Sequence, residues 1–572
     1  MRVLWFLWLI SYHQALSDNV NLMSSTYQIT QLFKHEQKFI RELKNYLVEL
    51  KNEVENVENF ISQNYYENDL EEVENQEDYI AHPINALGVI SRTCTESIQK
   101  LRFSAKIEQQ RKILQNLTEN APTMDDYIVA AQSIALLQES YDLTTEDLNN
   151  GVILDHKSDY TLSMYDRITI GTQAGNRKWF DSAVEWLEKA LENPDPTFHR
   201  VAQNQLKQMK HLHDQILDRR GPISGKHKTF PIPFDEKLRK KKKYRKKKRV
   251  KLKSEASFRP LFEDFESFNR NTEDYNGNFR SLCLNGSDHW RDPQVDQDLK
   301  CRFLHHSNPY LKMGPFQIEE LNLNPYVISI PDFIYSQEME FLKTNAQTDL
   351  KLSKIGNTNF KDDSFYRSSK QAWIIDKAFE IFDGTSKPKK IFYINEETNR
   401  TIYNLPLIQV ETNPVAVKLN QRIGLLTKMQ TQGPYSSEYY QVANYGVGGQ
   451  YGTHWDAFNI QVTGEGGWEA QQMGDRLATL MAYLSDVQVG GNTAFPMLGI
   501  SVKPAKGSAL FWMNLKPLGL TDKLSLHGGC PVVVGSKWIA NKWIKYYDQA
   551  FGFPCGLVPD SQYDLKRRFK KK

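Results

Sequence analysis

Tyr-Gln-Val-Ala-Asn-Tyr-Gly-Val-Gly-Gly-Gln-Tyr-Gly-Thr-His-Trp-Asp, residues 440–456, opens the stretch that decides the fold of this chain. On an extended strand, residues two apart point to the same face, so His454 and Asp456 can reach one ion while Trp455 points away. The stretch closes with His-Gly-Gly-Cys-Pro-Val-Val-Val-Gly-Ser-Lys-Trp-Ile-Ala-Asn-Lys-Trp, residues 527–543. His527, in another strand-like run, is the candidate third ligand. Two histidines and one carboxylate with the other positions open are typical of a non-haem Fe(II) site.

A cation completes the pattern. Lys537 lies ten residues beyond His527, past a run of three valines and a Gly-Ser turn, as expected if two adjacent strands carry one residue each. Oxygenases with such an iron site usually take 2-oxoglutarate, whose far carboxylate needs a charged partner. A His-x-Asp pair alone is most often a surface or structural feature, and structural zinc favours cysteines in a closed tetrahedron. The four positions together predict an iron site with a cationic anchor.

Residues 440–555 resemble the prolyl 4-hydroxylase alpha subunits. The resemblance rests on motifs in order, namely residues 442–451, the His-x-Asp pair, and residues 475–479, 483–487, 490–496 and 527–543. It implies that His454, Asp456 and His527 bind Fe(II) and that Lys537 pairs with the distal carboxylate of 2-oxoglutarate. It also implies that Tyr445 and Thr479 donate hydrogen bonds to that carboxylate. One departure is Gly452-Thr453, where the family usually has Glu-Pro beside the rim at which peptide enters.

The activity that the resemblance implies is that of a procollagen-proline 4-dioxygenase alpha subunit, which hydroxylates peptidyl proline with Fe(II), 2-oxoglutarate, dioxygen and L-ascorbate. The implied partners are protein disulfide isomerase as beta subunit, a second alpha subunit and a collagen-like or other proline-rich peptide. Two alternatives stay open. One keeps the chemistry but acts on a non-collagen secreted proline-rich substrate, and the other is an inactive paralogue that serves as a scaffold.

The N-terminus predicts a secretory address. Residues 1–17 combine Arg2, a short apolar run and small residues suited to cleavage, so they are expected to be a signal peptide and not a membrane span. We therefore expect the protein in the lumen of the endoplasmic reticulum, where disulfides persist. Sequons at Asn116, Asn285 and Asn399 agree with this address. By resemblance, Cys283 pairs with Cys301 and Cys530 with Cys555, which leaves Cys94 over.

The first third of the chain has helical patterns. Apolar residues form one seam at intervals of three and four: Ile40, Leu43, Leu47, Leu50, Val54, Val57 and Ile61. This favours a dimerising coiled coil, with an ordinary amphipathic helix as the alternative. Gly171, Ala183 and Ala190 fit a tetratricopeptide unit, although any helical hairpin can show such spacing. The family has a peptide-binding domain here, and one hairpin is expected to be shortened or missing between about residues 160 and 201.

Residues 237–253 form a block of like charge, which repels itself and is expected to stay unfolded. A protein with a signal peptide enters the secretory pathway, where a role in nucleic-acid binding is not expected. We therefore expect a solvated insert or a contact with an acidic partner. The alternative is a linker with no specific role. The basic residues 566–572 are interpreted in the same way. The chain has no Lys-Asp-Glu-Leu tail.

The expected fold is a multidomain α + β chain: all-α helices, with a coiled coil and a tetratricopeptide-like part, and then a double-stranded β-helix, or jelly roll. Strands are expected in short alternating runs at residues 390–393, 440–444, 477–484, 508–512 and 532–534. A bracing helix is expected at residues 373–382. The expected boundaries are a signal peptide at 1–17, a dimerisation region at 18–125, a peptide-binding domain at 126–222, a linker at 223–326, a dioxygenase domain at 327–556 and a basic tail at 557–572.

Overall fold

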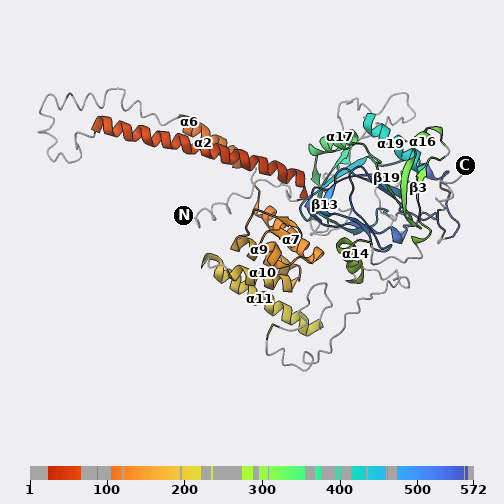
Figure 1. Ribbon diagram of the computed structural model, residues 1–572, viewed down its shortest axis with the longest axis horizontal. Helices are drawn as coiled ribbons and strands as arrows, with labels where there is room; N and C mark the ends of the chain where they lie inside the picture. The colour runs from red at the N-terminus through yellow and green to blue at the C-terminus, as the bar shows by residue number, and fades with distance from the viewer. Residues whose placement is uncertain are drawn as a thin grey trace. The chain divides into compact units, whose positions relative to one another are not determined.

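The computed structural model defines the helices and sheets of the chain (Figure 1). It describes residues 24–65, 105–118, 122–192, 196–220, 273–287, 296–306, 308–353, 367–374, 414–432, 436–458 and 473–558, and a few short stretches between and after them. The expected signal peptide, the basic insert and Cys94 lie outside the described residues. Two compact units form, Gln28–Met124 and a second unit of Met1–Tyr27 with Asp125–Lys572. None of the helices that the structure describes is both long and apolar enough to cross a membrane.

The first unit is dominated by helix α2 (Thr26–Tyr65), which is followed by α6 (Ala105–Thr118). The helix confirms the helical pattern expected between residues 40 and 61. Its apolar seam is exposed in the single chain, since Ile40, Leu43, Leu47, Val54 and Ile61 are 45% to 57% accessible. A 40-residue helix with an exposed apolar seam carries surface that another helix can cover.

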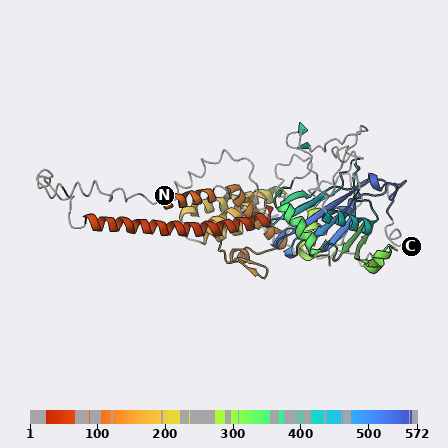
Figure 2. The same cartoon turned by 90° about the horizontal axis from the view of Figure 1, so that it is seen from above.

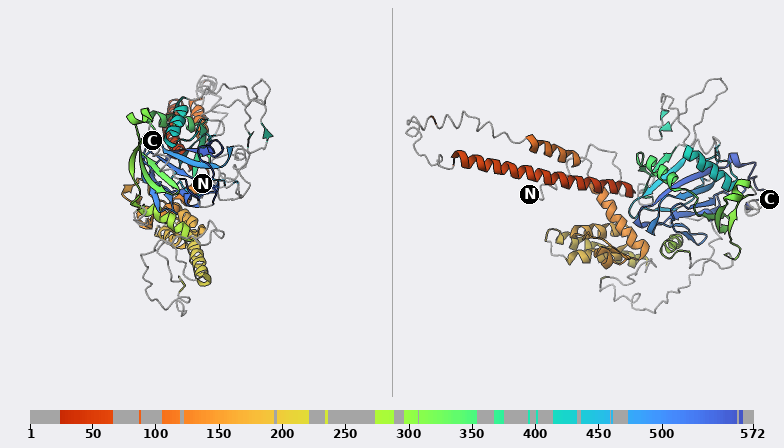
Figure 3. Two further views of the ribbon diagram at one scale, coloured as in Figure 1. Left: turned by 90° about the vertical axis from the view of Figure 1, so that its right-hand side faces the viewer. Right: turned by 45° about the horizontal axis from the view of Figure 1, so that its top comes forward.

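The second unit begins with helices α7 (Met124–Tyr141), α8 (Thr145–Asn149), α9 (Met164–Asn176), α10 (Phe180–Leu191) and α11 (Pro196–Arg220), with the short pair β1 (Val152–Ile153) and β2 (His156–Lys157) between α8 and α9 (Figure 3). Helices α9 and α10 pack closely because Gly171 has no side chain. A Cβ at this position would lie 3.0 Å from Cβ of Trp186. The indole of Trp186 in turn donates to Oε1 of Gln138 at 2.8 Å, which ties α10 to α7.

Two larger sheets form the core of the rest of this unit. The larger is antiparallel throughout, in the order β3-β4-β5-β16-β12-β19-β10-β7-β6. Its strands are β3 (Cys301–Leu304), β4 (Phe316–Leu323), β5 (Tyr326–Ile330), β6 (Lys351–Leu352), β7 (Ser369–Ile374), β10 (Tyr440–Tyr445), β12 (Arg476–Tyr483), β16 (Ala509–Met513) and β19 (Trp538–Lys545). The smaller sheet has the order β11-β17-β14-β15, formed by β11 (Tyr451–His454), β17 (His527–Gly529), β14 (Thr493–Phe495) and β15 (Ile500–Val502).

The larger sheet is covered on both faces. Helices α17 (Ser336–Gln347) and α19 (Pro414–Thr427) pack on one face and bury the main apolar cluster (Figure 2). A second cluster lies between the two sheets, where Tyr445, Tyr483, Trp512 and Ile539 from the larger sheet meet Phe495 from the smaller one. The short pair β13 (Val487–Gly490) and β18 (Val532–Gly535) lies beside them. Alternating side chains of the central strands therefore serve two cores.

The smaller elements complete the unit. They are helix α14 (Glu273–Asn285), helix α16 (Pro309–Met313), the pair β8 (Ile394–Asn395) and β9 (Arg400–Thr401), and the 3-10 helices η3 (Lys523–Ser525) and η4 (Tyr547–Gln549). Four of the expected strand runs coincide with β10, β12, β16 and β18, and the run at 390–393 lies outside the described residues. The prediction of a bracing helix at residues 373–382 is wrong for the two residues of this range that the structure describes. Trp373 and Ile374 end strand β7, which pairs with β10 over six residues, and residues 375–382 are not described.

The expected disulfides are also wrong. Cys283 is bonded to Cys530 across 247 residues, with the two Cα atoms 5.5 Å apart, whereas Cys301 and Cys555 are free and exposed. The reason is the position of α14, which lies against the smaller sheet and brings Cys283 to the end of β17. Cys301 instead begins β3, the edge strand of the larger sheet.

The two covering helices are joined by one ion pair that is suited to a test of stability. Arg422 of α19 donates to both carboxylate oxygens of Glu338 in α17, at 2.7 and 2.9 Å, and Glu338 accepts from the backbone of Tyr335. The substitution Arg422→Met leaves a largely buried carboxylate without its partner, so we expect a loss of about 2–3 kcal/mol in unfolding free energy.

Denaturant unfolding followed by tryptophan fluorescence measures this loss. Glu340→Gln, which removes an exposed pair with Lys343 within α17, is the control, and its effect should stay within about 0.5 kcal/mol. Equal effects of the two substitutions would contradict the role assigned to Arg422.

Candidate iron and co-substrate site

The three expected metal ligands meet where the smaller sheet ends. Strand β11 pairs with β17 so that His454 lies directly opposite His527, and Asp456 follows two residues after His454. Nε2 of His454 is 3.6 Å from Oδ1 of Asp456, and Nε2 of His527 is 3.7 Å from Oδ2 of the same carboxylate. The three candidate ligand atoms lie within 4.8 Å of one another. One cation can therefore contact all three.

Backbone carbonyl groups orient both imidazoles. Nδ1 of His454 lies 2.8 Å from the carbonyl oxygen of Gly452, and Nδ1 of His527 lies 2.9 Å from that of Ser525. A carbonyl oxygen can only accept, so each Nδ1 carries the proton and each Nε2 presents its lone pair to the ion. Burial lowers the pKa of His527 to about 4, against the opposing charge of Asp456, which keeps this ligand neutral at physiological pH.

The carboxylate is held ionised inside the protein. Burial raises the pKa of Asp456, whereas the charge that His527 and His454 carry when protonated, together with that of Arg476, holds this pKa well below the usual range. Oδ2 also accepts a 2.6 Å hydrogen bond from the hydroxyl of Thr479, which in turn accepts from the amide of Asn514 at 2.8 Å. Two neutral imidazoles and one carboxylate form the donor set that suits Fe(II), and the residues fit this ion.

Aromatic rings enclose the ligands. The ring of Tyr451 stacks on His454 with centroids 3.6 Å apart, and Trp512 and Phe495 contact the ring of His527 at 4.7 and 5.5 Å. The guanidinium of Arg367 lies 4.4 Å from the ring centre of Tyr451. Such walls limit the access of water and fix the ring planes.

Lys537 is buried near Gly529 of β17, the strand that begins with His527. Its side chain is 1% exposed, and burial lowers the pKa of Lys537 to about 7. Nζ is 5.0 Å from the ring centre of Tyr445, and both side chains converge on Gly529. A Cβ placed on Gly529 would lie 3.5 Å from Nζ of Lys537 and 3.9 Å from the hydroxyl of Tyr445. This glycine leaves space between a cation and a hydroxyl donor, which fits the far carboxylate of 2-oxoglutarate.

Thr479 lies on the metal side of this arrangement, where its hydroxyl binds Asp456. Its expected hydrogen bond to 2-oxoglutarate stays a prediction. Thr493 was missed in the sequence, although it pairs with Gly529 across the sheet and receives a 2.7 Å hydrogen bond from Tyr483. The signal in the sequence was the motif at residues 490–496, which contains Thr493 and supports the family resemblance.

A buried charge cluster behind the iron ligands was also missed. Arg476 donates to both carboxylate oxygens of Glu438, at 2.7 and 2.8 Å, and Lys545 lies 3.0 Å from the same group. Burial opposes the charge on Glu438, but these two cations hold its pKa at about 2. Arg476 also donates to the backbone carbonyl of Asp456 and stacks on Trp543 at 3.7 Å. Trp543 is thus a buried aromatic beside the site.

The comparisons with known proteins agree with this geometry. Residues 440–545 match the model of the 2OG-Fe(II) oxygenase superfamily, and residues 25–155 match that of the prolyl 4-hydroxylase alpha-subunit N-terminal region. The chain is 28% identical to a prolyl 4-hydroxylase subunit alpha-2 of Caenorhabditis elegans over 507 residues, which cover 85% of this chain and 84% of that protein. It is 27% identical to a subunit alpha-1 of Homo sapiens over 550 residues, or 93% and 94% of the two chains.

Among solved structures, a viral collagen prolyl hydroxylase of Paramecium Bursaria Chlorella virus-1 in complex with 2OG has 26% sequence identity and a TM-score of 0.25. The match covers 38% of this chain and 95% of that one.

The oxygenase model and the site define this protein as a 2-oxoglutarate-dependent Fe(II) oxygenase. The model of the N-terminal region and the relatives that match most of the chain place it more narrowly, as a protein of the prolyl 4-hydroxylase alpha-subunit type. Its reaction is the hydroxylation of proline.

The buried Lys537 predicts a pH dependence of co-substrate binding. The carboxylate of 2-oxoglutarate stabilises the charged lysine, so binding above pH 7 requires proton uptake. The dissociation constant should therefore be flat below pH 7 and rise by up to about tenfold per pH unit above it.

Calorimetric titration of the metal-loaded protein between pH 6 and 9 measures this profile. Lys537→Arg keeps its charge throughout this range and should flatten the profile, although binding weakens because the geometry changes. A wild-type constant that does not change between pH 7 and 9 would contradict the assignment.

The metal assignment makes a second prediction. His454→Ala removes one of three ligands, so we expect turnover to be abolished and the affinity for Co(II), an oxygen-stable probe, to fall at least tenfold. The melting temperature of the metal-free protein should change little. His156→Ala, at an exposed histidine of β2, is the matched control and should leave turnover and metal affinity unchanged. Full activity in His454→Ala would show that the iron site lies elsewhere.

Proposed function

We propose that this chain is the catalytic alpha subunit of an enzyme that hydroxylates C4 of proline in collagen-like chains, within the lumen of the endoplasmic reticulum. The observation that supports the chemistry most directly is the convergence of Nζ of Lys537 and the hydroxyl of Tyr445 on Gly529, whose strand also carries His527. An iron site alone would serve many reactions. An iron site beside a buried lysine and a tyrosine hydroxyl suits a 2-oxo acid co-substrate.

Each group of the chain has a defined task in this reaction. His454, Asp456 and His527 would hold Fe(II), and Lys537 with Tyr445 would hold the far carboxylate of 2-oxoglutarate. When bound, the iron and 2-oxoglutarate supply the oxidising power drawn from dioxygen. Tyr451, Trp512 and Phe495 exclude water from the ligands, and Arg476 supports the backbone of Asp456. The protein thus contributes position and a dry environment.

The finer features of the fold belong to the same proposal. The two facing sheets would form a double-stranded β-helix, and α9 with α10 would form a tetratricopeptide-like hairpin in a peptide-binding domain. The close packing of Gly171 against Trp186 between α9 and α10 supports this hairpin. The names of the relatives support a subunit role. We therefore include protein disulfide isomerase as beta subunit, a second alpha subunit as partner, and ascorbate as the reductant that restores oxidised iron.

The substrate is the part that most needs a test. Hydroxyproline formation is measured by mass spectrometry on Pro-Pro-Gly repeats and on other proline-rich peptides, with the chain co-expressed with protein disulfide isomerase and supplied with Fe(II), 2-oxoglutarate and ascorbate. We expect product on the collagen-like repeats. Product only on other peptides would redirect the substrate to a non-collagen secreted protein, which the altered rim at Gly452-Thr453 favours. No product from a soluble, iron-loaded complex would favour the inactive scaffold.

The exposed seam of α2 supports the second alpha subunit as the partner that covers it. Replacing Leu43 and Leu47 together by glutamate puts charges in the centre of the seam, so we expect dimers to dissociate into single alpha subunits. Light scattering during size-exclusion chromatography measures the mass. Val48→Glu, at an exposed position beside the seam, is the control and should leave the dimer intact. Dimers that survive the double substitution would show that another surface pairs the subunits.

A further inference from the structure

We propose that helices α14 and α7 act together as a brace, outside the two sheets, that positions strand β17 and with it the iron ligand His527. This inference rests on the proposed iron site. The brace has three contacts with the segment that follows His527: the ring of Phe279 on Gly528, the disulfide from Cys283 to Cys530, and the hydrogen bond from Tyr141 to Pro531. Phe279, Cys283 and Tyr141 are positioning residues, because none of them belongs to the group of candidate ligands.

Strand β17 needs support from outside because its own sequence defines it poorly. It has three residues, and the two after His527 are glycines. Glycine adds no packing within a strand and loses more conformational freedom on folding than other residues. The pairing of β17 with β11 is irregular between its two aligned positions. A ligand on such a strand is held within the tenths of an ångström that metal binding requires only if neighbouring groups fix the backbone.

Phe279 of α14 supplies the first contact. A Cβ on Gly528 would lie 2.8 Å from Cε2 of Phe279 and 3.0 Å from the carbonyl oxygen of Tyr451. The aromatic ring therefore rests directly on the backbone of the residue after His527. The glycine permits this approach, and the ring fills the space that a side chain would otherwise occupy.

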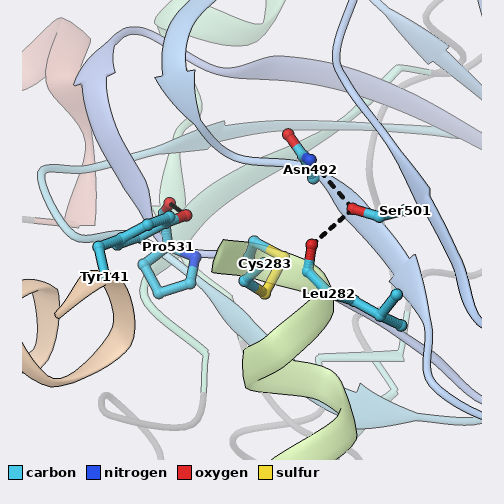
Figure 4. The surroundings of a disulfide bond; sticks show 7 residues. Tyr141, Leu282, Cys283, Asn492, Ser501 and Pro531 are labelled. Carbon is cyan, nitrogen blue, oxygen red and sulfur yellow. Dashed lines mark hydrogen bonds between the residues drawn. A yellow bond between two sulfur atoms is a disulfide. The ribbon is translucent and has the colours of Figure 1, made fainter. Parts of the chain in front are cut away.

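The disulfide supplies the second contact, and further bonds fasten the same end of α14 (Figure 4). Cys283 is bonded to Cys530, three residues after His527. The hydroxyl of Ser501 in β15 donates to the carbonyl of Leu282 at 2.9 Å and accepts from the side-chain amide of Asn492 at 3.0 Å. Leu282, Cys283, Cys530 and Ala494 form one buried apolar cluster with Phe279 packed against it. Helix α14 is thus fixed to β14 and β15, on one side of β17.

Helix α7 supplies the third contact and closes the brace. The hydroxyl of Tyr141 donates to the carbonyl oxygen of Pro531 at 2.6 Å, and Tyr141 packs with Leu137 and Val533 in a small apolar cluster. Figure 4 shows Tyr141 and Pro531 beside Cys283. Arg280 of α14 donates to the carbonyl oxygen of Glu139 and pairs with Asp142, which joins α14 to the C-terminal end of α7. Residues 528–533 therefore run between two helices that are bound to each other.

The test compares metal affinity with stability. Co(II) binding to the full chain is measured by calorimetry, and the melting temperature of the metal-free protein is measured in parallel. We expect the Co(II) dissociation constant to rise at least tenfold in Cys283→Ser/Cys530→Ser and in Phe279→Ala, at temperatures where both remain folded. Tyr141→Phe removes only one hydroxyl and should raise the constant two- to fivefold. Phe279→Leu, which restores an apolar cover, should recover part of the affinity lost in Phe279→Ala.

Three controls separate the possible outcomes. Cys301→Ser/Cys555→Ser removes the two exposed thiols and should leave Co(II) binding unchanged. Peptide mapping without reduction should find Cys283 joined to Cys530, and pairs of Cys283 with Cys301 and Cys530 with Cys555 would overturn the brace. Lower melting temperatures with unchanged metal affinity would show a merely structural role and also overturn it. If the wild type binds Co(II) no better than His454→Ala does, the iron assignment itself fails, which is a different result.

Discussion

The register between strands β11 and β17 is the constraint on which the rest of the site depends. It sets His454 opposite His527, and because side chains alternate along a strand, a shift of one residue would turn either imidazole to the opposite face. The carboxylate of Asp456 then lies less than 4 Å from both rings. The other features of the site depend on this pairing. The backbone carbonyls orient the two imidazoles that it brings together, and the aromatic rings enclose them.

Burial of charge is the second organising feature. Three charged side chains are nearly inaccessible to solvent: Asp456, Lys537 and Glu438. They differ in whether the protein itself supplies an opposite charge. His527, His454 and Arg476 lower the pKa of Asp456, and Arg476 and Lys545 lower that of Glu438, so both carboxylates stay ionised. Burial instead lowers the pKa of Lys537 to about 7, which leaves it to be compensated by a ligand. A buried cation without its counter-charge is destabilising by itself, and this cost is typical of a binding site.

The helices do more than cover the sheets. Arg422 and Glu338 join α17 to α19 on one side of the large sheet. On the smaller sheet, α14 and α7 contact the segment between His527 and Lys537. Helix α7 also contacts α10 through the hydrogen bond between Gln138 and Trp186. The same helix therefore connects the helical part of the second unit with the metal-binding strands. Elements distant in the sequence thus fix a segment of six residues, 528–533.

The sequence by itself determined the features that depend on short spacing. His454 and Asp456 share a strand face because they are two residues apart, and Lys537 follows His527 at the distance of one strand and a turn. The seam of α2 was equally visible, since helical periodicity is a local property. Only the tertiary structure decided the contacts between distant segments, such as the link from Cys283 to Cys530, the cluster of Glu438 with Arg476, and the position of Phe279 on Gly528. Trp373 shows the same limit, because its helix-like surroundings were overridden by pairing with β10. Such contacts arise from packing across long stretches of chain, which local residue patterns do not encode.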